Sequence, residues 1–305
     1  MLDTVIIGSG PAGLAAAIYA SRAALNYVVL EKAGYSGGQI VTTNDLDNYP
    51  GMPNIDGASF SMALQEHAEK LGAEIKEATV TAIKQNEDNS YTVEIEGQEP
   101  PILTKSVVLA TGANPRTLNV PGEQQYLSRG VYYCATCDGA FYRNKTTAVI
   151  GGGNTALEDV LFLAKICEKV YLIHRRDELR GDKHSQEKIF AMPNVEFVKS
   201  ALPKSIKGDK KVSAIEIEYK KTGEIVDIPV DGIFVAVGMI PNNQLVPDFV
   251  NTDDAGYVIA DETGKTNAKG FFVAGDLRTK DLRQVLTAAS DGANAIKSVT
   301  DYLNE

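Results

Sequence analysis

Two cysteines three positions apart, Cys134 and Cys137, carry the most distinctive chemistry in this sequence, and the acid Asp138 follows them directly. Thiols at this spacing can close a disulfide, and a carboxyl group beside them can exchange protons with them. The pair lies between two glycine-rich nucleotide loops, which begin at Gly8 and Gly151. A dithiol between two nucleotide sites predicts a relay of electrons.

Two other interpretations of the cysteine pair remain open from the sequence. A C-x-x-C pair is half of a zinc site, but zinc needs further ligands. The remaining cysteine is Cys167, and no histidine lies at finger-like spacing from Cys137. The pair could also be two small side chains in a core. A redox pair is favoured over both, and no metal site is expected.

The first glycine loop has the pattern of a dinucleotide-binding turn. Gly8-x-Gly10-x-x-Gly13 follows a short apolar strand and opens an alanine-rich helix. Free N–H groups at the start of such a helix can hold a pyrophosphate. The next strand ends at Glu31, close to the roughly 20-residue offset of a ribose-binding acid. The loop therefore predicts a first βαβ nucleotide-binding unit.

The second glycine loop repeats this architecture. Gly151-x-Gly153 follows another apolar strand, and Asn154 and Thr155 fill the turn before a helix expected to run to about Cys167. A second nucleotide-binding unit is predicted here.

The strand after the second loop ends in a basic cluster, His174, Arg175 and Arg176, and Arg180 follows. An acid at this position would repel a 2′-phosphate, whereas arginines attract it. The cluster therefore favours NADPH over NADH. A solvated basic strand end is the alternative interpretation.

Length and composition limit the class of protein. The chain has 305 residues, 44% hydrophobic content and a formal charge of −10. The length argues for two domains, and the acidity disfavours nucleic acid or an anionic membrane surface as a partner. No run reaches the roughly 18 apolar residues of a membrane helix, and three cysteines cannot form a secreted disulfide framework. A cytoplasmic protein is expected.

The two units look like an internal duplication, because each closes with an apolar strand that ends in glycine near proline and asparagine. The segment after the second unit reads as a return to the first domain. We therefore expect a discontinuous first domain, residues 1–115 and 246–305, and an inserted second domain, residues 116–245. The two connections between them could serve as a hinge.

Together these features resemble the bacterial low-molecular-weight NADPH-dependent thioredoxin reductases, which are class II pyridine nucleotide-disulfide oxidoreductases. The resemblance covers nearly the whole chain and rests on Gly8-Ser9-Gly10-Pro11-Ala12-Gly13, Gly37-Gly38-Gln39, Cys134-Ala135-Thr136-Cys137-Asp138-Gly139, Gly151-Gly152-Gly153-Asn154-Thr155-Ala156 and His174-Arg175-Arg176. It implies an α/β fold of two Rossmann-like, three-layer (ββα) dinucleotide-binding domains, with the NADPH domain inserted into the FAD domain.

The resemblance also assigns cofactor contacts. The implied FAD contacts are Gly8, Gly10, Pro11, Ala12, Gly13, Glu31, Gly38, Gln39, Asn48, Gly112, Asp276, Arg283, Gln284 and Val285. The implied NADPH contacts are Gly151, Gly153, Asn154, Thr155, His174, Arg175, Arg176 and Arg180. Asp276, Asn48 and Gln39 could instead be residues that stabilise turns and loops.

The implied activity is a relay from NADPH through FAD and the Cys134–Cys137 disulfide to oxidised thioredoxin, with rotation of the NADPH domain between the half-reactions. Cys137 would face the flavin, Cys134 would attack thioredoxin, and Asp138 would donate and accept the proton. A homodimer is implied as well. Two other functions remain open: an FAD-dependent dithiol oxidase that uses oxygen, and a non-catalytic flavin redox sensor.

Overall fold

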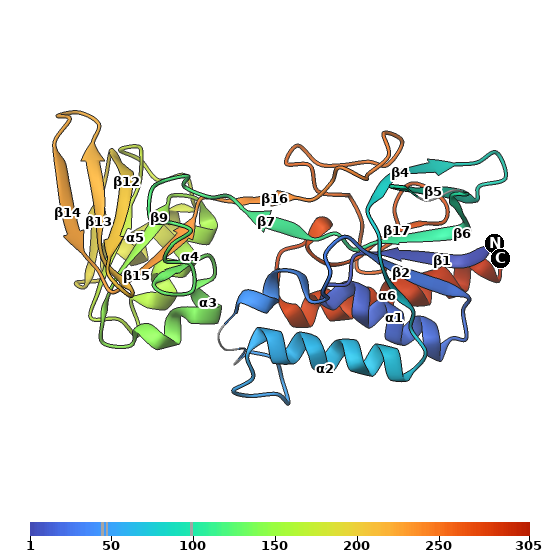
Figure 1. The fold of residues 1–305 in the computed structure, drawn as a ribbon. Helices are drawn as coiled ribbons and strands as arrows, with labels where there is room; N and C mark the ends of the chain where they lie inside the picture. The colour runs from blue at the N-terminus through green and yellow to red at the C-terminus, as the bar shows by residue number, and fades with distance from the viewer. Residues whose placement is uncertain (44–45, 47, 98–99) are drawn as a thin grey trace. The chain divides into compact units, whose positions relative to one another are not determined.

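The computed structural model describes the whole chain except residues 44–45, 47 and 98–99. The described residues divide into two compact units (Figure 1). Unit 1 comprises Met1–Thr42, Tyr49–Asn114 and Ile240–Glu305. Unit 2 comprises Pro115–Met239 and the short segment Thr43–Asn48.

Unit 1 is built on a seven-stranded sheet of order β3-β2-β1-β6-β5-β4, in which β17 also pairs with β6. Strands β1, β2, β3, β6 and β17 pair in parallel, and β4 and β5 add an antiparallel hairpin. The strands are β1 (Leu2–Ile7), β2 (Tyr27–Glu31), β3 (Ile75–Glu77), β4 (Val80–Gln85), β5 (Tyr91–Ile95), β6 (Ile102–Leu109) and β17 (Phe271–Val273). The helices are α1 (Pro11–Arg22), α2 (Gly57–Lys70) and α6 (Val285–Leu303), with short 3-10 turns η1 (Gly38–Thr42) and η3 (Gly275–Leu277).

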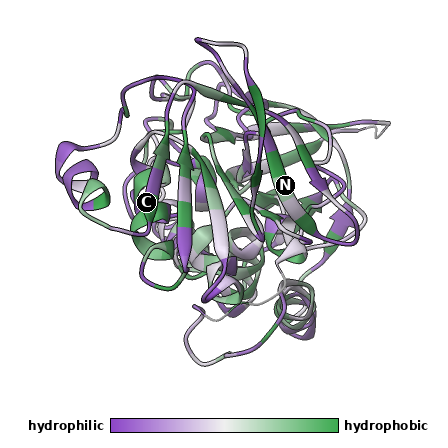
Figure 2. Cartoon of the chain, turned by 90° about the vertical axis from the view of Figure 1, so that its left-hand side faces the viewer, coloured by the Kyte–Doolittle hydropathy of each residue, from purple (hydrophilic) through white to green (hydrophobic). Residues whose placement is uncertain are grey.

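The parallel strands β1, β2 and β17 of unit 1 are buried on both faces, which explains their almost continuous apolar sequence. On one face, Ile6, Val29 and Val108 pack against α1 and α6. Alternate residues such as Val5 and Val107 point to a second core on the opposite face, as the period of two in a strand requires. Strands with long hydrophobic stretches are visible in Figure 2.

Unit 2 has a five-stranded parallel sheet of order β11-β10-β9-β15-β8 and a three-stranded antiparallel sheet of order β12-β13-β14. The strands are β8 (Val131–Tyr132), β9 (Thr146–Gly151), β10 (Lys169–Ile173), β11 (Val195–Val198), β12 (Ala201–Gly208), β13 (Val212–Tyr219), β14 (Ile225–Pro229) and β15 (Gly232–Ala236). The helices are α3 (Ala135–Asp138), α4 (Asn154–Leu163) and α5 (Lys183–Phe190), with the 3-10 turn η2 (Gly139–Tyr142). Both units are Rossmann-like, so the predicted α/β fold class is confirmed.

The chain crosses between the units through two short strands that pair with each other, β7 (Ala113–Pro115) and β16 (Met239–Pro241). Residues 240–245 group with unit 1, because Asn242 is bonded to Thr111 and Gly112 of that unit. The helix expected to reach Cys167 ends earlier, at Leu163. None of the helices among the described residues is long and apolar enough to cross a membrane.

Candidate functional site

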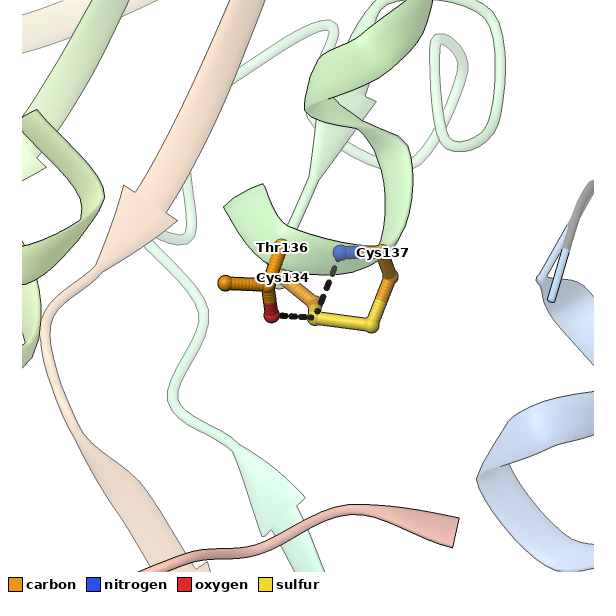
Figure 3. Close-up of a disulfide and its surroundings, with 3 residues drawn as sticks. All are labelled: Cys134, Thr136 and Cys137. Atoms are coloured by element: carbon orange, nitrogen blue, oxygen red, sulfur yellow. Dashed lines mark hydrogen bonds between the residues drawn. A yellow bond between two sulfur atoms is a disulfide. The ribbon is translucent and has the colours of Figure 1, made fainter. Parts of the chain in front are cut away.

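Cys134 and Cys137 form a disulfide at the start of α3, with their Cα atoms 5.3 Å apart (Figure 3). Cys134 is the N-cap of this turn, and the Cys137 N–H donates to its Sγ at 3.2 Å. The Thr136 hydroxyl lies 3.4 Å from the same sulfur. Both cysteines are half-buried. The sulfurs are bonded to each other, and the N–H aimed at Sγ would favour a thiolate on Cys134 after reduction.

Asp138 is the last residue of α3 and is buried. Its negative charge is among the causes that raise the pKa of Tyr142, although burial of Tyr142 is the largest cause. The carboxyl group is thus held inside unit 2, one residue from Cys137. Cys167, the remaining cysteine, is free and buried, and burial raises the pKa of its thiol. That environment suits a packing residue.

The strand end before the disulfide is held by a buried acid that sequence reasoning missed. Glu123 accepts hydrogen bonds from the Leu118 and Asn119 N–H groups at 2.8 Å, and from the Tyr133 hydroxyl at 2.9 Å. Only 2% of Glu123 is exposed. Because Tyr133 precedes Cys134, this carboxylate links the side chain next to the redox motif to the backbone of Leu118 and Asn119. A lone glutamate in a polar stretch gives no sequence signal for this role.

The first glycine loop in unit 1 depends on close backbone approach. Gly8 has φ +101°, and a Cβ there would lie 2.5 Å from the Ala110 carbonyl oxygen. A Cβ at Gly13 would lie 1.8 Å from the Gly8 carbonyl oxygen. Gly10 has more space, since its Cβ would approach only the Gly37 oxygen, at 3.9 Å. Helix α1 begins at Pro11, with the buried Ala12 next, and no side chain caps its first turn, so the N–H groups that follow the proline could bind an anion.

Glu31 lies at the end of β2 beside this loop, as predicted from the sequence offset. Its Oε2 accepts from the Ser9 N–H and from the Ser9 hydroxyl, both at 2.7 Å. The loop at Gly38 also comes close, because a Cβ there would lie 3.7 Å from the Gly10 Cα. Gln39 donates from Nε2 to the Ala113 carbonyl oxygen. The structure therefore gathers three separate sequence segments around Gly10.

Gly112 lies beyond β6 with φ +69°, and a Cβ there would meet no atom of the described chain within 4 Å. Asn242 holds the adjoining backbone, donating from Nδ2 to the Thr111 carbonyl oxygen at 2.8 Å and from its N–H to the Gly112 carbonyl oxygen at 2.9 Å. Asn48 is exposed and groups with unit 2, whereas the other implied flavin contacts belong to unit 1.

Asp276 lies in η3, directly after β17. Its Oδ1 is buried and has no hydrogen-bond partner among the residues that the structure describes. Burial raises the pKa of this carboxyl group, while the charges of Lys280 and Arg283 oppose the rise and that of Asp291 adds to it. A buried, unpaired carboxylate oxygen is costly unless a ligand group bonds to it. Asp276 thus fits a site for hydroxyl groups.

Three further implied flavin contacts follow Asp276. The Arg283 guanidinium lies 4.1 Å over the Tyr257 ring, and its Nε is buried without a partner in the described chain. Gln284 is the N-cap of α6, and its N–H donates to the Thr287 hydroxyl at 3.1 Å. Val285 is the first residue of α6. The orphaned atoms of Asp276 and Arg283 and the open space at Gly112 and Gly10 fit a polar cofactor with a diphosphate and hydroxyl groups.

The second glycine loop, in unit 2, joins β9 to α4. A Cβ at Gly151 would lie 2.3 Å from the Ala236 carbonyl oxygen, whereas one at Gly153 would meet no described atom within 4 Å. Asn154 and Thr155 are exposed at the start of α4. The Asn154 Oδ1 accepts from the Asp182 N–H at 2.8 Å. The loop thus has the same combination of tight turn and open helix end as the first.

The arginines expected at this loop lie beside it. Arg180 donates its N–H to the Gly152 carbonyl oxygen at 2.6 Å, and Arg175, Arg176 and Arg180 are all exposed. A cavity of about 370 Å³ is lined by residues 176–180. Arg176 and Arg180 line this hollow together with the acids Asp177 and Glu178, so the arginines are placed where they could attract a phosphate, with two carboxylates nearby.

His174 differs from its arginine neighbours because it is buried. A Cβ on Gly152 would lie 2.4 Å from the imidazole, and the Nε2 atom has no partner in the described part of the chain. Burial lowers the pKa of His174, and the charges of Arg180, Arg175 and Arg176 lower it further. The imidazole therefore supports the loop backbone from beneath, which the basic sequence cluster does not reveal.

Sequence and structure comparisons agree on the relationship. The model of the family described as "Pyridine nucleotide-disulphide oxidoreductase" matches residues 2–292. A thioredoxin reductase of Peptoclostridium acidaminophilum is 42% identical and aligns over 99% of this chain and 96% of that protein. One of Treponema pallidum (strain Nichols) is 39% identical over 99% of this chain and 97% of that protein.

Among solved structures, a thioredoxin reductase from Streptococcus pyogenes MGAS5005 matches with a TM-score of 0.92 and 43% sequence identity. The match covers 100% of this chain and 98% of that one. Two glycine loops, a disulfide between them and a full-length family match lead to one conclusion: the chain belongs to the pyridine nucleotide-disulphide oxidoreductase family.

Proposed function

We propose that the protein is an NADPH-dependent flavoprotein that reduces thioredoxin, a thioredoxin-disulfide reductase. The observation that carries the proposal is the Cys134–Cys137 disulfide, which lies in the same unit as the second glycine loop and the exposed Arg176 and Arg180. The relatives named thioredoxin reductase, which match the chain over nearly its full length, support the choice of substrate.

FAD is the cofactor proposed for unit 1. Gly8, Gly10 and Gly13 with the start of α1 would hold its diphosphate, Glu31 a ribose, and Asp276 a hydroxyl group through the unpaired Oδ1. FAD, when bound, would supply transfer of two electrons from NADPH to the disulfide. NADPH is proposed for unit 2, with Arg176 and Arg180 on its 2′-phosphate.

The cysteines perform the second half of the reaction. After reduction, the Cys134 thiolate attacks one sulfur of the oxidised thioredoxin disulfide, and that S–S bond breaks as a mixed disulfide forms. The Cys137 thiolate then attacks Cys134 Sγ, which re-forms the Cys134–Cys137 bond and releases thioredoxin with two thiols. Asp138 gives a proton to the first thioredoxin thiolate that leaves and then takes the proton of the Cys137 thiol, while the second leaving thiolate takes its proton from solvent. The substrate is reduced by two electrons and the dithiol is oxidised by two.

The proposal includes a homodimer, a cytoplasmic location and rotation of the NADPH-binding unit between the half-reactions. These three points rest on the family resemblance and on the sequence. Size-exclusion chromatography with light scattering tests the first. A crosslink that prevents the rotation should abolish turnover and leave bound FAD in place.

The decisive experiment is an anaerobic titration of the purified protein with NADPH and, separately, with NADH, followed by addition of thioredoxin. We expect NADPH to bleach the flavin of the wild type, and of Cys134→Ser, while only the wild type reduces thioredoxin. The matched control is Cys167→Ser, which removes a buried cysteine outside the motif and should leave turnover intact.

Three results would contradict the proposal. Protein that stays colourless after FAD reconstitution would show that it does not bind the flavin. Oxidised flavin that survives excess NADPH would indicate an oxidase fed by small dithiols or a sensor without turnover. Reduction of thioredoxin by Cys134→Ser would show that the Cys134 sulfur is not the nucleophile that attacks thioredoxin.

A further inference from the structure

A buried cluster of charges lies next to Asp276 and has no part in the function described above. Asp291 projects from α6, and Arg278 and Lys280 lie in the segment that follows η3. The side chains of Asp291 and Arg278 are 2% exposed and that of Lys280 is 4% exposed. Burial of three full charges is expensive, and such clusters are weak evidence for stability alone.

Asp291 is the centre of this cluster. Arg278 binds it with two parallel hydrogen bonds, from Nε to Oδ2 at 2.9 Å and from Nη2 to Oδ1 at 2.8 Å. Lys280 donates from Nζ to Oδ2 at 2.8 Å. The paired geometry of the guanidinium fixes both the position and the plane of the carboxylate.

The same carboxylate also reaches the backbone next to Asp276. The Gly275 N–H donates to Asp291 Oδ2 at 3.0 Å. Asp291 thus holds the turn that carries Asp276 at three places: one before the acid, at Gly275, and two after it, at Arg278 and Lys280. With its neighbours bonded on both sides, the Asp276 backbone has little freedom to move.

Helix α6 is itself fitted closely to the first glycine loop. A Cβ on Gly292, the residue after Asp291, would lie 2.0 Å from the Ala12 carbonyl oxygen in the first turn of α1. A Cβ on Gly275 would lie 3.0 Å from the Ala12 Cβ. The start of α1 and the turn that carries Asp276 therefore both pack closely against the same part of α6.

We propose that Asp291 is a positioning residue for the cofactor site: through Gly275, Arg278 and Lys280 it holds the turn so that the unpaired Asp276 Oδ1 faces the ligand. This inference rests on the proposed function, because the ligand concerned is FAD. A preorganised acceptor gains affinity because its ordering does not have to occur during binding.

The electrostatics agree with this role. The charges that act on Asp276 are Lys280, Arg283 and Asp291: the two cations lower the pKa of Asp276, and Asp291 raises it, against a background of burial that raises it most. Asp291 thus keeps Lys280 in place as a counter-charge, while Arg278, which also pairs with Glu262 at 2.9 Å, offsets part of the Asp291 charge.

The test measures binding of FAD to apoprotein by quenching of flavin fluorescence. We expect Asp291→Asn to weaken binding roughly ten- to hundredfold, the factor for a lost hydrogen bond to a charged group. Lys280→Met keeps the Arg278–Asp291 pair and should weaken binding about tenfold or less on the same scale. Lys297→Met is the matched control, since Lys297 lies on the same helix in an exposed pair with Asp301 and should leave binding unchanged.

A double-mutant cycle with Asp276→Asn separates positioning from general destabilisation. If Asp291 acts through Asp276, then Asp291→Asn should add little to the loss already caused by Asp276→Asn. Should Asp291→Asn fail to fold, the same cycle is run with Lys280→Met, which decides the matter in its place.

Two outcomes overturn the inference alone: folded Asp291→Asn and Lys280→Met that bind FAD as the wild type does, or a penalty that persists in full when Asp276 is already asparagine. Wild-type apoprotein that binds no FAD would instead contradict the proposed function, and this inference would fail with it.

Discussion

Asp159 should make the free energy of unfolding fall as the pH rises, and Asp159→Asn should remove that fall. Asp159 lies on α4 and is 8% exposed. Burial raises the pKa of its carboxyl group from 3.8 to about 7, the charge of Glu158 adds to the rise, and a hydrogen bond from the Ala135 backbone opposes it. Ala135 is the first residue of α3, so this acid lies beneath the redox motif.

The size and sign follow from proton binding. Between pH 3.8 and about 7 the folded protein keeps the Asp159 proton while the unfolded chain has lost it. The Asp159 contribution to the free energy of unfolding therefore falls by about 1.4 kcal/mol for each pH unit in this window, up to about 4 kcal/mol, and is flat above it. Asparagine keeps an oxygen for the Ala135 N–H but carries no charge. Asp159→Asn should therefore match the wild type near pH 4 and exceed it by up to about 4 kcal/mol at pH 8.

The assay is urea unfolding of oxidised holoprotein followed by circular dichroism, repeated at intervals from pH 4 to pH 8. Glu158→Gln is the control, since it removes the exposed neighbour and should remove only a small part of the slope. An Asp159→Asn variant with the same pH slope as the wild type would refute the reasoning. So would one destabilised equally at pH 5 and pH 8.

Three further outcomes are expected. Gly13→Ala should lose bound flavin and melt at a lower temperature, because the new Cβ would lie 1.8 Å from the Gly8 carbonyl oxygen; a normal yellow protein with an unchanged Tm would contradict this. Burial, and then the nearby arginines, lower the pKa of His174, so the unfolded chain takes up a proton before the folded protein does as the pH falls below 6.5, and the His174 contribution to stability declines there. His174→Gln should reduce this loss of stability at acid pH in the urea assay. An unchanged profile would exclude the imidazole as its source. Arg176→Ala should lower the ratio of kcat/KM for NADPH to that for NADH by roughly ten- to hundredfold, and an unaltered ratio would place the phosphate elsewhere.

Local motifs made much of this molecule predictable. The spacing of Cys134 and Cys137 places two sulfurs within one turn of backbone, so their pairing depends on few other residues. Gly13 predicted a tight strand-to-helix turn for a similar reason: the contact that excludes a Cβ there is with Gly8, five positions earlier in the chain. Such features are determined by neighbours in the chain, and they are visible before the fold is known.

Ends of elements and the roles of isolated residues were less predictable. The helix expected to reach Cys167 stops at Leu163. The Asn194 side chain, which comes from a later loop, donates hydrogen bonds to the carbonyl oxygens of Ala164 and Cys167. His174 belongs to a basic cluster in sequence, yet its imidazole lies buried under Gly152. The sequence pattern does not show which side chains at the end of a strand point toward a neighbouring loop.

The sequence by itself determined the two nucleotide-binding turns, the redox pair and the α/β class, because each follows from short-range spacing and period. Only the tertiary structure decided that Asp291 holds the Asp276 turn, that Asn242 holds the backbone at Gly112, and that Glu123 secures the residue before Cys134. The first two are hydrogen bonds between a side chain and distant backbone, and the third joins the Glu123 carboxylate to the Tyr133 hydroxyl. Their partners are chosen by the packing of whole elements, and no local spacing encodes that choice.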